Sequence, residues 1–355
     1  MILRHWLGRL RPGTEAELLR RLRAVIPELL SASAPIDFTY GFRHEAGRTT
    51  FLTLSDWRDF ESVSAAAGDD LSRTIPAALD DLFDSTQAGT YERLPPDPVR
   101  LDLADGRVIG VVTGRVRPQH ESVAQAMVDR SARQAIEAGA LAAHLGRRLV
   151  DGVTEFVVAV VWPKREAMSR FVRSRSMPAV DPAFTAHLVE WRFETYNALS
   201  PERLLVPPEG PAVLILDDEG WYIDTTPSVE SVLGFPGELL YGRSLFDLAP
   251  DPAGRADIVR RLVGSGPSEG LVDLLRPDGP ATRVRYRSAT NVPGVGLHAV
   301  ILASPDEPLD RRPVGAIVTE TLGLEALAAL EPSPAGFVAT QATGATEAIE
   351  ASETA

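Results

Sequence analysis

The sequence predicts an α+β protein with two consecutive copies of one β-α-β-β-α-β unit, followed by a third α+β domain and an acidic tail. Three observations support this prediction. Identical residues recur at a spacing of 105 to 106 positions through the first 200 residues. Strand-like alternation and helical spacing follow one another in the same order in each copy. The pattern of the chain then changes after a proline-rich joint at 201–211.

The composition is that of a folded protein and excludes several classes. Hydrophobic residues make up 44% and charged residues 24% of the 355 positions, close to the globular average. No run of about 18 apolar residues could span a membrane, and residues 1–6 resemble a strand rather than a secretory leader, so we expect a cytoplasmic protein. The absence of cysteine excludes disulfides and thiolate metal sites, and a net charge of −13 disfavours nucleic acid as a partner.

The internal repeat defines the first two domains. The segment Gly8-Arg9-Leu10-Arg11-Pro12 recurs 106 positions later as Gly114-Arg115-Val116-Arg117-Pro118. After a slip of one residue, the matches continue at a spacing of 105: Gly41 with Gly146, Arg43 with Arg148, Phe51 with Phe156, Trp57 with Trp162, and Tyr91 with Tyr196. A proline-rich joint at 94–98 separates the copies. We therefore predict domains over 1–95 and 99–200.

Each copy has the same predicted order of elements. A strand (107–117 in the second copy) leads into a stretch with helical spacing, 14–30 in the first copy and 120–140 in the second. Two short strands follow, joined by a turn that contains Gly47 in the first copy and Asp151-Gly152 in the second. The predicted strands are 36–43 with 49–54, and 143–150 with 154–161. A helix after each tryptophan and a last strand near Tyr91 or Tyr196 complete the unit.

The order β-α-β-β-α-β is the ferredoxin-like motif, in which helices cover one face of an antiparallel sheet. The other face needs a partner, and an adjacent copy supplies one. With a tryptophan after the third strand, Trp57 and Trp162, the sequence resembles the antibiotic biosynthesis monooxygenase superfamily of dimeric α+β barrels. The resemblance implies that the two copies form an intramolecular pseudo-dimeric barrel.

The resemblance alone does not establish an activity, because this superfamily includes cofactor-independent monooxygenases, haem-degrading enzymes and proteins of unassigned role. The haem-degrading members use an asparagine, a tryptophan and a histidine. The corresponding places here hold Trp6, then Ala66 or Phe171, then Pro76 or Asp181. That triad is absent, and we predict no catalytic residue and no metal site.

Three residues are candidates for binding a ligand in the barrel: His144, Phe156 and Trp162. An imidazole can move protons near neutrality, and aromatic side chains can line a substrate pocket. The favoured interpretation is structural. His144, like His44, would be a partly exposed hydrogen-bonding side chain, and the repeated tryptophans would be core anchors.

The third segment, 210–305, resembles a PAS domain. Strands at 212–216 and 221–223 flank an acidic turn, and Val232-Leu233-Gly234-Phe235 with Gly242-Arg243-Ser244 follow the PAS pattern. A long helix is expected at 253–263, then strands at 271–276, 281–289 and 296–302, the first two joined by Pro277-Asp278-Gly279. Many family members carry asparagine where this chain has Thr226.

The chemistry that known PAS cofactors require is missing. A cysteine adduct with flavin is excluded, and the helix at 253–263 has no histidine for haem, so we expect no cofactor. A small ligand could lie near Phe235, Phe246, Tyr286 and His298. A core filled by the same side chains is equally consistent with the sequence. The sheet can also serve as a homodimer or partner interface.

The tail over 306–355 has nine carboxylates against Arg311 and Arg312 and few periodic apolar residues. We expect it to be mostly disordered, apart from a short helix around 322–330. The hypothesis for the whole chain is a non-enzymatic sensory or adaptor protein, in which the PAS-like domain binds a small ligand or a protein partner and the barrel binds a ligand or acts as a scaffold. The alternative is a cofactor-independent monooxygenase regulated by the PAS-like domain.

Overall fold

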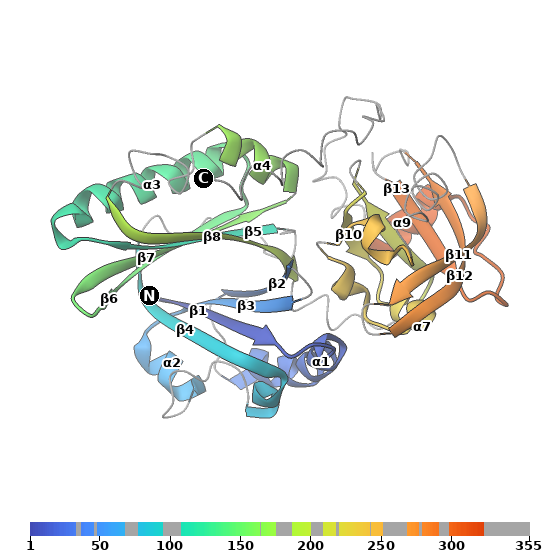
Figure 1. Ribbon diagram of the computed structural model, residues 1–355, viewed down its shortest axis with the longest axis horizontal. Helices are drawn as coiled ribbons and strands as arrows, with labels where there is room; N and C mark the ends of the chain where they lie inside the picture. The colour runs from blue at the N-terminus through green and yellow to red at the C-terminus, as the bar shows by residue number, and fades with distance from the viewer. Residues whose placement is uncertain are drawn as a thin grey trace, which may run out of the picture.

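An eight-stranded closed barrel and a five-stranded antiparallel sheet organise the chain, which is α+β as predicted (Figure 1). In Figure 1 the barrel strands form two layers with helices on their outer sides, and the second sheet lies beside them. The computed structural model describes residues 1–32, 37–45, 48–67, 77–94, 108–163, 165–174, 187–199, 209–217, 220–241, 243–250, 268–276, 279–290 and 298–322.

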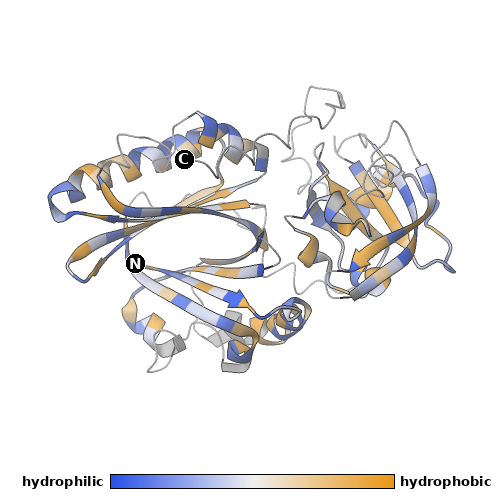
Figure 2. Ribbon diagram, viewed as in Figure 1, coloured by the Kyte–Doolittle hydropathy of each residue, from blue (hydrophilic) through white to orange (hydrophobic). Residues whose placement is uncertain are grey.

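Both halves of the barrel have the predicted order of elements. The first half contains β1 (Ile2–Leu10), α1 (Glu15–Ala32), β2 (Asp37–Glu45), β3 (Arg48–Trp57), α2 (Phe60–Ala67), a 3-10 helix (Ala77–Leu82) and β4 (Phe83–Leu94). The second half contains β5 (Val108–Val116), a 3-10 turn (Pro118–His120), α3 (Glu121–Glu137), β6 (Ala142–Val150), β7 (Val153–Trp162), α4 (Arg165–Arg173) and β8 (Leu188–Leu199). Figure 2 shows hydrophobic and hydrophilic segments alternating along strands of the first half, as expected where a strand has two different faces.

Local sequence explains several of these elements. Helix α3 buries Ala124, Val128, Ala132 and Ala135, a spacing of three to four residues that places them on one face. The turn between β6 and β7 holds Asp151 at φ 51° and Gly152 at φ 76°, so both residues are in the left-handed region that a two-residue hairpin requires. The equivalent turn residue Gly47 lies outside the described residues.

The barrel closes along two short seams, where β2 pairs with β8 and β4 pairs with β6. At the first seam the partners are Tyr40 with Leu199, Gly41 with Ala198 and Phe42 with Asn197. The other seam pairs Leu145 with Leu94, Gly146 with Arg93 and Arg147 with Glu92. Each of these residues is the repeat equivalent, 105 positions away, of a residue in the corresponding pair of the first seam. The two halves therefore meet with the same register at both seams.

Gly146 and its repeat equivalent Gly41 stand at these seams because a tyrosine packs directly on each of them. A Cβ atom on Gly146 would lie 2.6 Å from the Cβ of Tyr91, and one on Gly41 would lie 2.8 Å from the Cβ of Tyr196. Neither tyrosine Cβ can move without moving its strand. A side chain at either glycine would therefore push the two halves of the barrel apart.

We expect Gly146→Ala to lower the free energy of unfolding by about 1–3 kcal/mol, the usual cost of overpacking a rigid core. Urea denaturation of the full chain measures this value. Gly110→Ala is the matched control, since a Cβ there would lie no nearer than 3.4 Å to its neighbours and should change stability by less than about 1 kcal/mol. Equal effects of the two substitutions would contradict this account of the seam.

The strands pack on both faces. Leu3, Leu54, Val111, Val157 and Tyr196 belong to an apolar cluster on the faces that point into the barrel. Opposite faces pack against the helices, for example Val158 and Trp162 with Val128 of α3. Trp57 and Trp162 are 6% and 1% exposed, which confirms that the repeated tryptophans are buried in the core.

The third domain contains β9 (Ala212–Leu216), β10 (Tyr222–Thr225), α7 (Val229–Leu233), 3-10 helices Gly237–Leu240 and Leu245–Leu248, β11 (Ser268–Arg276), β12 (Gly279–Ala289) and β13 (His298–Ala303). Its sheet has the order β10-β9-β13-β12-β11, with all pairs antiparallel. The expected long helix at 253–263 lies outside the described residues.

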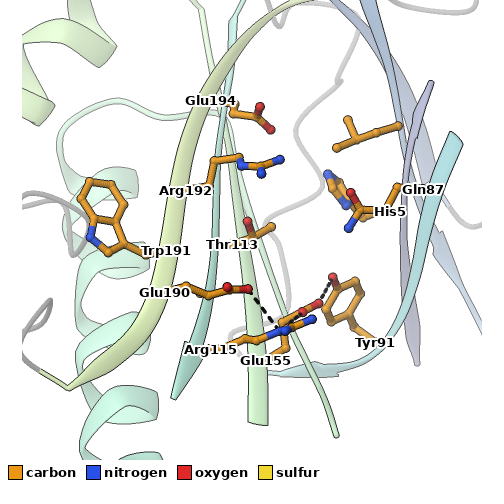
Figure 3. Close-up of a pocket in the computed structure, with 12 residues that line it drawn as sticks. His5, Gln87, Tyr91, Thr113, Arg115, Glu155, Glu190, Trp191, Arg192 and Glu194 are labelled. Atoms are coloured by element: carbon orange, nitrogen blue, oxygen red, sulfur yellow. Dashed lines mark hydrogen bonds and ion pairs between the residues drawn. The ribbon is translucent and has the colours of Figure 1, made fainter. Parts of the chain in front are cut away.

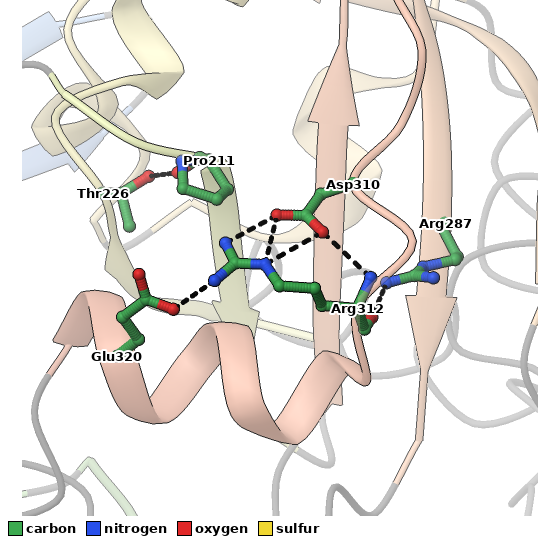
Figure 4. A network of polar contacts seen from close by, with 6 residues as sticks. All are labelled: Pro211, Thr226, Arg287, Asp310, Arg312 and Glu320. Carbon is green, nitrogen blue, oxygen red and sulfur yellow. Dashed lines mark hydrogen bonds and ion pairs between the residues drawn. The ribbon is translucent and has the colours of Figure 1, made fainter.

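The chain after 306 is ordered further than predicted. Helix α9 (Val314–Leu322) packs Ile317 and Val318 against Val213 and Ile301 on the outer sheet face. Around it, Arg312 pairs with Asp310 and Glu320, and Arg287 donates to the carbonyl of Arg312 (Figure 4). These exposed pairs add little stability, so apolar burial is what orders this segment. The prediction of disorder from 306 onward therefore needs correction as far as residue 322.

The third domain is joined to the first half of the barrel by a partly buried polar contact. Arg23 of α1 donates to Glu230 of α7 at 2.6 Å and to both carboxylate oxygens of Glu238 at 3.1 and 3.2 Å. The side chain of Glu238 is only 5% exposed. One continuous apolar cluster includes residues of both domains, such as Leu19 and Tyr241. The two domains therefore share part of their core.

Candidate functional site

A cavity of about 200 Å³ lies in the lumen of the barrel, between strands of both halves (Figure 3). It is lined by His5, Leu7, Gln87, Tyr91, Thr113, Gly114, Arg115, Glu155, Glu190, Trp191, Arg192 and Glu194. His5, Gln87 and Tyr91 come from β1 and β4 on one side, and most charged residues come from β5, β7 and β8 on the other. The side chain of Trp191 points away from the lumen in Figure 3. The wall is therefore largely polar.

Glu155 of β7 is the centre of a hydrogen-bonded group in this wall. Tyr91 donates its hydroxyl to Glu155 Oε1 at 2.7 Å, Arg148 donates to the same oxygen at 2.7 Å, and Arg115 donates to Oε2 at 3.1 Å. The guanidinium of Arg148 also stacks 4.7 Å from the centre of the Tyr91 ring. Burial raises the pKa of Glu155, but the Tyr91 hydrogen bond and the Arg148 charge outweigh it, so its pKa lies below the usual value.

A related group stands at the other seam. Tyr196 donates to Glu194 Oε2 at 3.0 Å, and Arg43 pairs with the same carboxylate. Tyr91 and Tyr196 are repeat equivalents, as are Arg148 and Arg43, whereas the two glutamates come from different strands. Each tyrosine therefore meets the arginine of the opposite half, which links the two halves through the lumen.

His5 and Arg192 face each other across the cavity (Figure 3). His5 is 4% exposed, and its Nε2 has no hydrogen-bond partner among the residues that the structure describes. Burial lowers the pKa of His5 to about 4, helped by the charge of Arg148 and opposed by Glu155. Its imidazole is therefore neutral at pH 7. Arg192 is exposed at the rim and makes no ion pair or hydrogen bond with the described residues.

We expect His5 to make the protein less stable in acid. Its pKa is about 4 when folded against about 6.5 when unfolded, so the unfolded state takes up the proton first as pH falls from 6.5 towards 4. This costs about 2 kcal/mol of unfolding free energy between pH 7.5 and 5, by the linkage relation. His5→Gln should show a drop smaller by that amount in urea denaturation at the two pH values. An equal drop in both proteins would refute the assignment.

A second polar group lies further along the lumen, beside the pairing of Leu3 with Asp56. Asp56 Oδ2 accepts from Arg93 at 2.8 Å and lies 2.9 Å from His144 Nδ1. The side chains of Arg93, Asp56 and His144 are 3%, 1% and 3% exposed. Asp56 and Arg93 therefore form an ion pair that is almost completely removed from water.

The barrel residues proposed from the sequence do not share one cavity. His144 points into the lumen, whereas Phe156 and Trp162 belong to the cluster on the helix-facing side of the sheet. The expectation that His144 would be partly exposed is wrong, because it fills the lumen beside Asp56. His44 is half-buried and hydrogen-bonded to Thr49 at 3.0 Å, as expected.

In the third domain the proposed residues lie close in the fold. Phe235 and Tyr286 belong to one buried cluster. His298, 2% exposed, is on the same sheet face as Val300 and Leu302 of that cluster, since alternate residues of β13 share a face. The Phe246 side chain lies outside the described residues. Whether these residues bind a ligand stays a prediction.

The lumen residues His5, Arg115, Glu155 and Arg192 were missed by the sequence reasoning. A signal for them exists: Tyr91 with Tyr196, and Arg43 with Arg148, are polar residues that recur at equivalent positions of both copies. Polar residues retained on an inward strand face indicate a polar lumen. Finding their glutamate partners requires the register across the seams.

Two further observations concern the part of the chain that the structure describes. It contains no group of three histidine or carboxylate residues arranged to hold a metal ion. Among its helices, none is long and apolar enough to cross a membrane.

Comparison with known proteins finds matches among solved structures. No protein-family model and no curated protein matches the chain. A "putative monooxygenase" from Fusobacterium nucleatum matches 56% of this chain and 92% of its own at 10% identity and a TM-score of 0.47. A ferredoxin-fold protein from Listeria monocytogenes, related to antibiotic biosynthesis monooxygenases, matches 56% of this chain and 95% of its own at 11% identity and a TM-score of 0.35. A domain of a sensory box sensor histidine kinase/response regulator from Geobacter sulfurreducens matches 26% of this chain and 82% of its own at 22% identity and a TM-score of 0.23.

Proposed function

We propose that this chain is a non-enzymatic sensory or adaptor protein: the barrel lumen binds a small molecule, and the PAS-like third domain transmits its presence to a partner. The observation that carries the proposal is the lumen cavity, whose polar wall is built by both halves of the barrel. A preformed concave site with a few convergent polar groups is the usual form of a small-molecule site.

The protonation of the wall favours binding over proton-transfer catalysis. General acid–base catalysis works best with a pKa near the working pH. Here burial lowers the pKa of His5 to about 4, and burial raises the pKa values of Tyr91 and Tyr196 above their ordinary value. The Tyr91 hydrogen bond and the Arg148 charge hold the pKa of Glu155 below its usual value. His5, Tyr91, Tyr196 and Glu155 therefore do not change protonation near pH 7, which favours binding of a ligand over transfer of protons.

The sheet of the third domain supports its interpretation as PAS-like. Numbered within the domain, its strands have the order 2-1-5-4-3, and short helices follow the second strand. Thr226, where many PAS domains carry asparagine, donates to the Pro211 carbonyl at 2.9 Å (Figure 4). It also accepts from the Val213 amide at 2.9 Å. Thr226 thus holds the two ends of the first hairpin together, which an asparagine amide could also do.

Side chains connect the seam between β2 and β8 to the third domain. Asn197 of β8 donates to the carbonyl of Phe42 across the seam at 3.1 Å and accepts from Arg165 at 2.8 Å. The guanidinium of Arg165 lies 5.0 Å from the ring centre of Trp221 in the third domain. A change at this seam would therefore reach Trp221 through one arginine.

Two measurements on the full chain test the proposal. Protein purified from its native cells should release a stoichiometric small molecule on denaturation, detected by mass spectrometry. Adding that molecule back should slow amide hydrogen exchange both in β8 and around Trp221. A protein that retains no molecule, together with unchanged exchange in the third domain on addition of the native-cell extract, would refute the proposal.

The alternative, an oxygen-using monooxygenase, predicts a different cavity. Cofactor-independent oxidation of an aromatic substrate calls for a dry apolar site of about 300 Å³ or more. The lumen cavity is smaller, about 200 Å³, and its wall is charged. We expect no oxygen uptake when the protein is incubated with anthrone-type or hydroquinone substrates. Sustained turnover, abolished by filling the lumen through Thr113→Trp, would support the enzyme.

A further inference from the structure

We propose that the lumen cavity recognises a compact monocarboxylate, which Arg192 binds through its guanidinium while His5 and Gln87 meet the remaining polar atoms of the ligand. This inference rests on the proposed function, in which the lumen is the ligand site. It adds the chemical class of the ligand and the residue that determines it.

Among the wall residues that the structure describes, the pairing of charges leaves one cation, Arg192, without an ionic partner. Each wall carboxylate already has cationic or hydroxyl partners: Glu155 has Tyr91, Arg115 and Arg148, Glu190 has Arg115, and Glu194 has Arg43 and Tyr196. Arg192 makes no such contact with the described residues. The charge available to a ligand is therefore positive.

Arg192 is also placed to use that charge. It lies on β8 between Glu190 and Glu194, and Figure 3 shows its guanidinium directed into the cavity, towards His5. A guanidinium offers two parallel N–H groups that match the two oxygens of a carboxylate. A cationic ligand would be repelled by Arg192 and find the glutamates already occupied.

The opposite wall adds neutral polar groups. His5 is more than nine-tenths buried and faces the cavity, and no residue in the described part of the chain forms a hydrogen bond with its Nε2. Leaving such a buried atom unpaired costs free energy, which a ligand hydroxyl or carbonyl could recover. Gln87, exposed at the rim, can both donate and accept.

Size and charge narrow the class further. A cavity of about 200 Å³ is below the usual range for drug-sized ligands, so the ligand is a small acid of a few carbon atoms. Arg192 can compensate one negative charge, and a second one would lie beside wall carboxylates without a cationic partner of its own, which is costly where water is partly excluded. Dicarboxylates and phosphate should therefore bind more weakly than monocarboxylates.

The test uses the full chain and matched probes in saturation-transfer NMR and calorimetry. Lactate and propionate are compared with lactamide and propionamide, which have nearly the same shape without the charge, and with succinate and inorganic phosphate. We expect the monocarboxylates to bind at least about tenfold more tightly than their amides, the size of one charge-assisted hydrogen-bond pair.

Variants test whether Arg192 is the residue that binds the carboxylate. Arg192→Gln should weaken lactate binding about tenfold or more and leave lactamide binding unchanged, while Arg192→Lys should retain part of the preference for lactate. Arg130→Gln removes the same charge from an exposed position of α3 and should change neither. His5→Leu should weaken lactate binding, with propionate affected less because it lacks the hydroxyl.

The outcomes separate the two proposals. If amides bind as tightly as acids, or if Arg192→Gln leaves the preference intact, the carboxylate assignment is wrong although the lumen still binds small molecules. If none of the probes binds, and a molecule retained from native cells carries no carboxylate, the assignment is wrong as well. If no probe binds and no molecule is retained, both proposals fail.

Discussion

Asp56→Asn should lower the free energy of unfolding by about 3–5 kcal/mol, the cost of leaving one member of a buried ion pair without its partner. The Arg93 side chain is 3% exposed, and Asp56 is the carboxylate that it contacts. An asparagine keeps the shape but leaves the guanidinium charge uncompensated inside the barrel. Chemical denaturation followed by tryptophan fluorescence measures the loss.

Two further variants separate charge from shape. Asp80→Asn, at an exposed position of the same half, should change stability by less than about 0.5 kcal/mol. Adding Arg93→Met to Asp56→Asn should restore part of the lost stability, because it removes the uncompensated charge. A double variant as unstable as the sum of the two single variants would show that the ion pair is not the source of the effect.

Arg23→Gln should separate the third domain from the barrel in unfolding experiments and cost about 2–4 kcal/mol. Glu238 is almost fully buried, and Arg23 supplies two hydrogen bonds to it in addition to one to Glu230. Without the guanidinium, the Glu238 carboxylate can regain solvation only if the domains move apart. Calorimetry should show one transition in the wild type and two in the variant.

Arg20→Gln is the control for this experiment, since Arg20 is a 68% exposed residue of the same helix that pairs with Glu17. It should leave a single transition and a stability within about 0.5 kcal/mol of the wild type. Combining Arg23→Gln with Glu238→Gln should recover part of the loss, because a buried amide costs less than a buried charge. Two transitions in the Arg20 variant as well would mean that loss of the Arg23 contact is not what separates the domains.

Much of the fold could be predicted because its information is local or repeated. The change from alternating to helical periodicity marked β5 and α3 within a few residues of their observed ends. The shared register of Trp57 and Trp162 predicted two units of the same fold. Because each unit leaves one sheet face uncovered by helices, the two uncovered faces were predicted to pack against each other. These inferences need no knowledge of which residues touch.

The site could not be predicted in the same way, because it depends on pairing between distant strands. Glu155 meets Tyr91 only after β4 pairs with β6 in one register, and a shift of one residue would turn every side chain to the opposite face. Helix α9 was missed for a related reason. Its apolar residues Ile317 and Val318 are too few to stabilise a helix alone and become ordered only against the sheet.

The two halves of the barrel are equivalent in backbone and different in what they contribute to the lumen. The position of Asp56 is taken by Val161 in the other half, that of His5 by Val111, and that of Gln87 by Arg192. A barrel of two identical chains would have to carry each of these side chains twice, including two buried carboxylates. When the halves are joined in one chain, each of these side chains can occur once. The lumen can thus hold a single asymmetric binding site, and we expect one ligand to bind per chain.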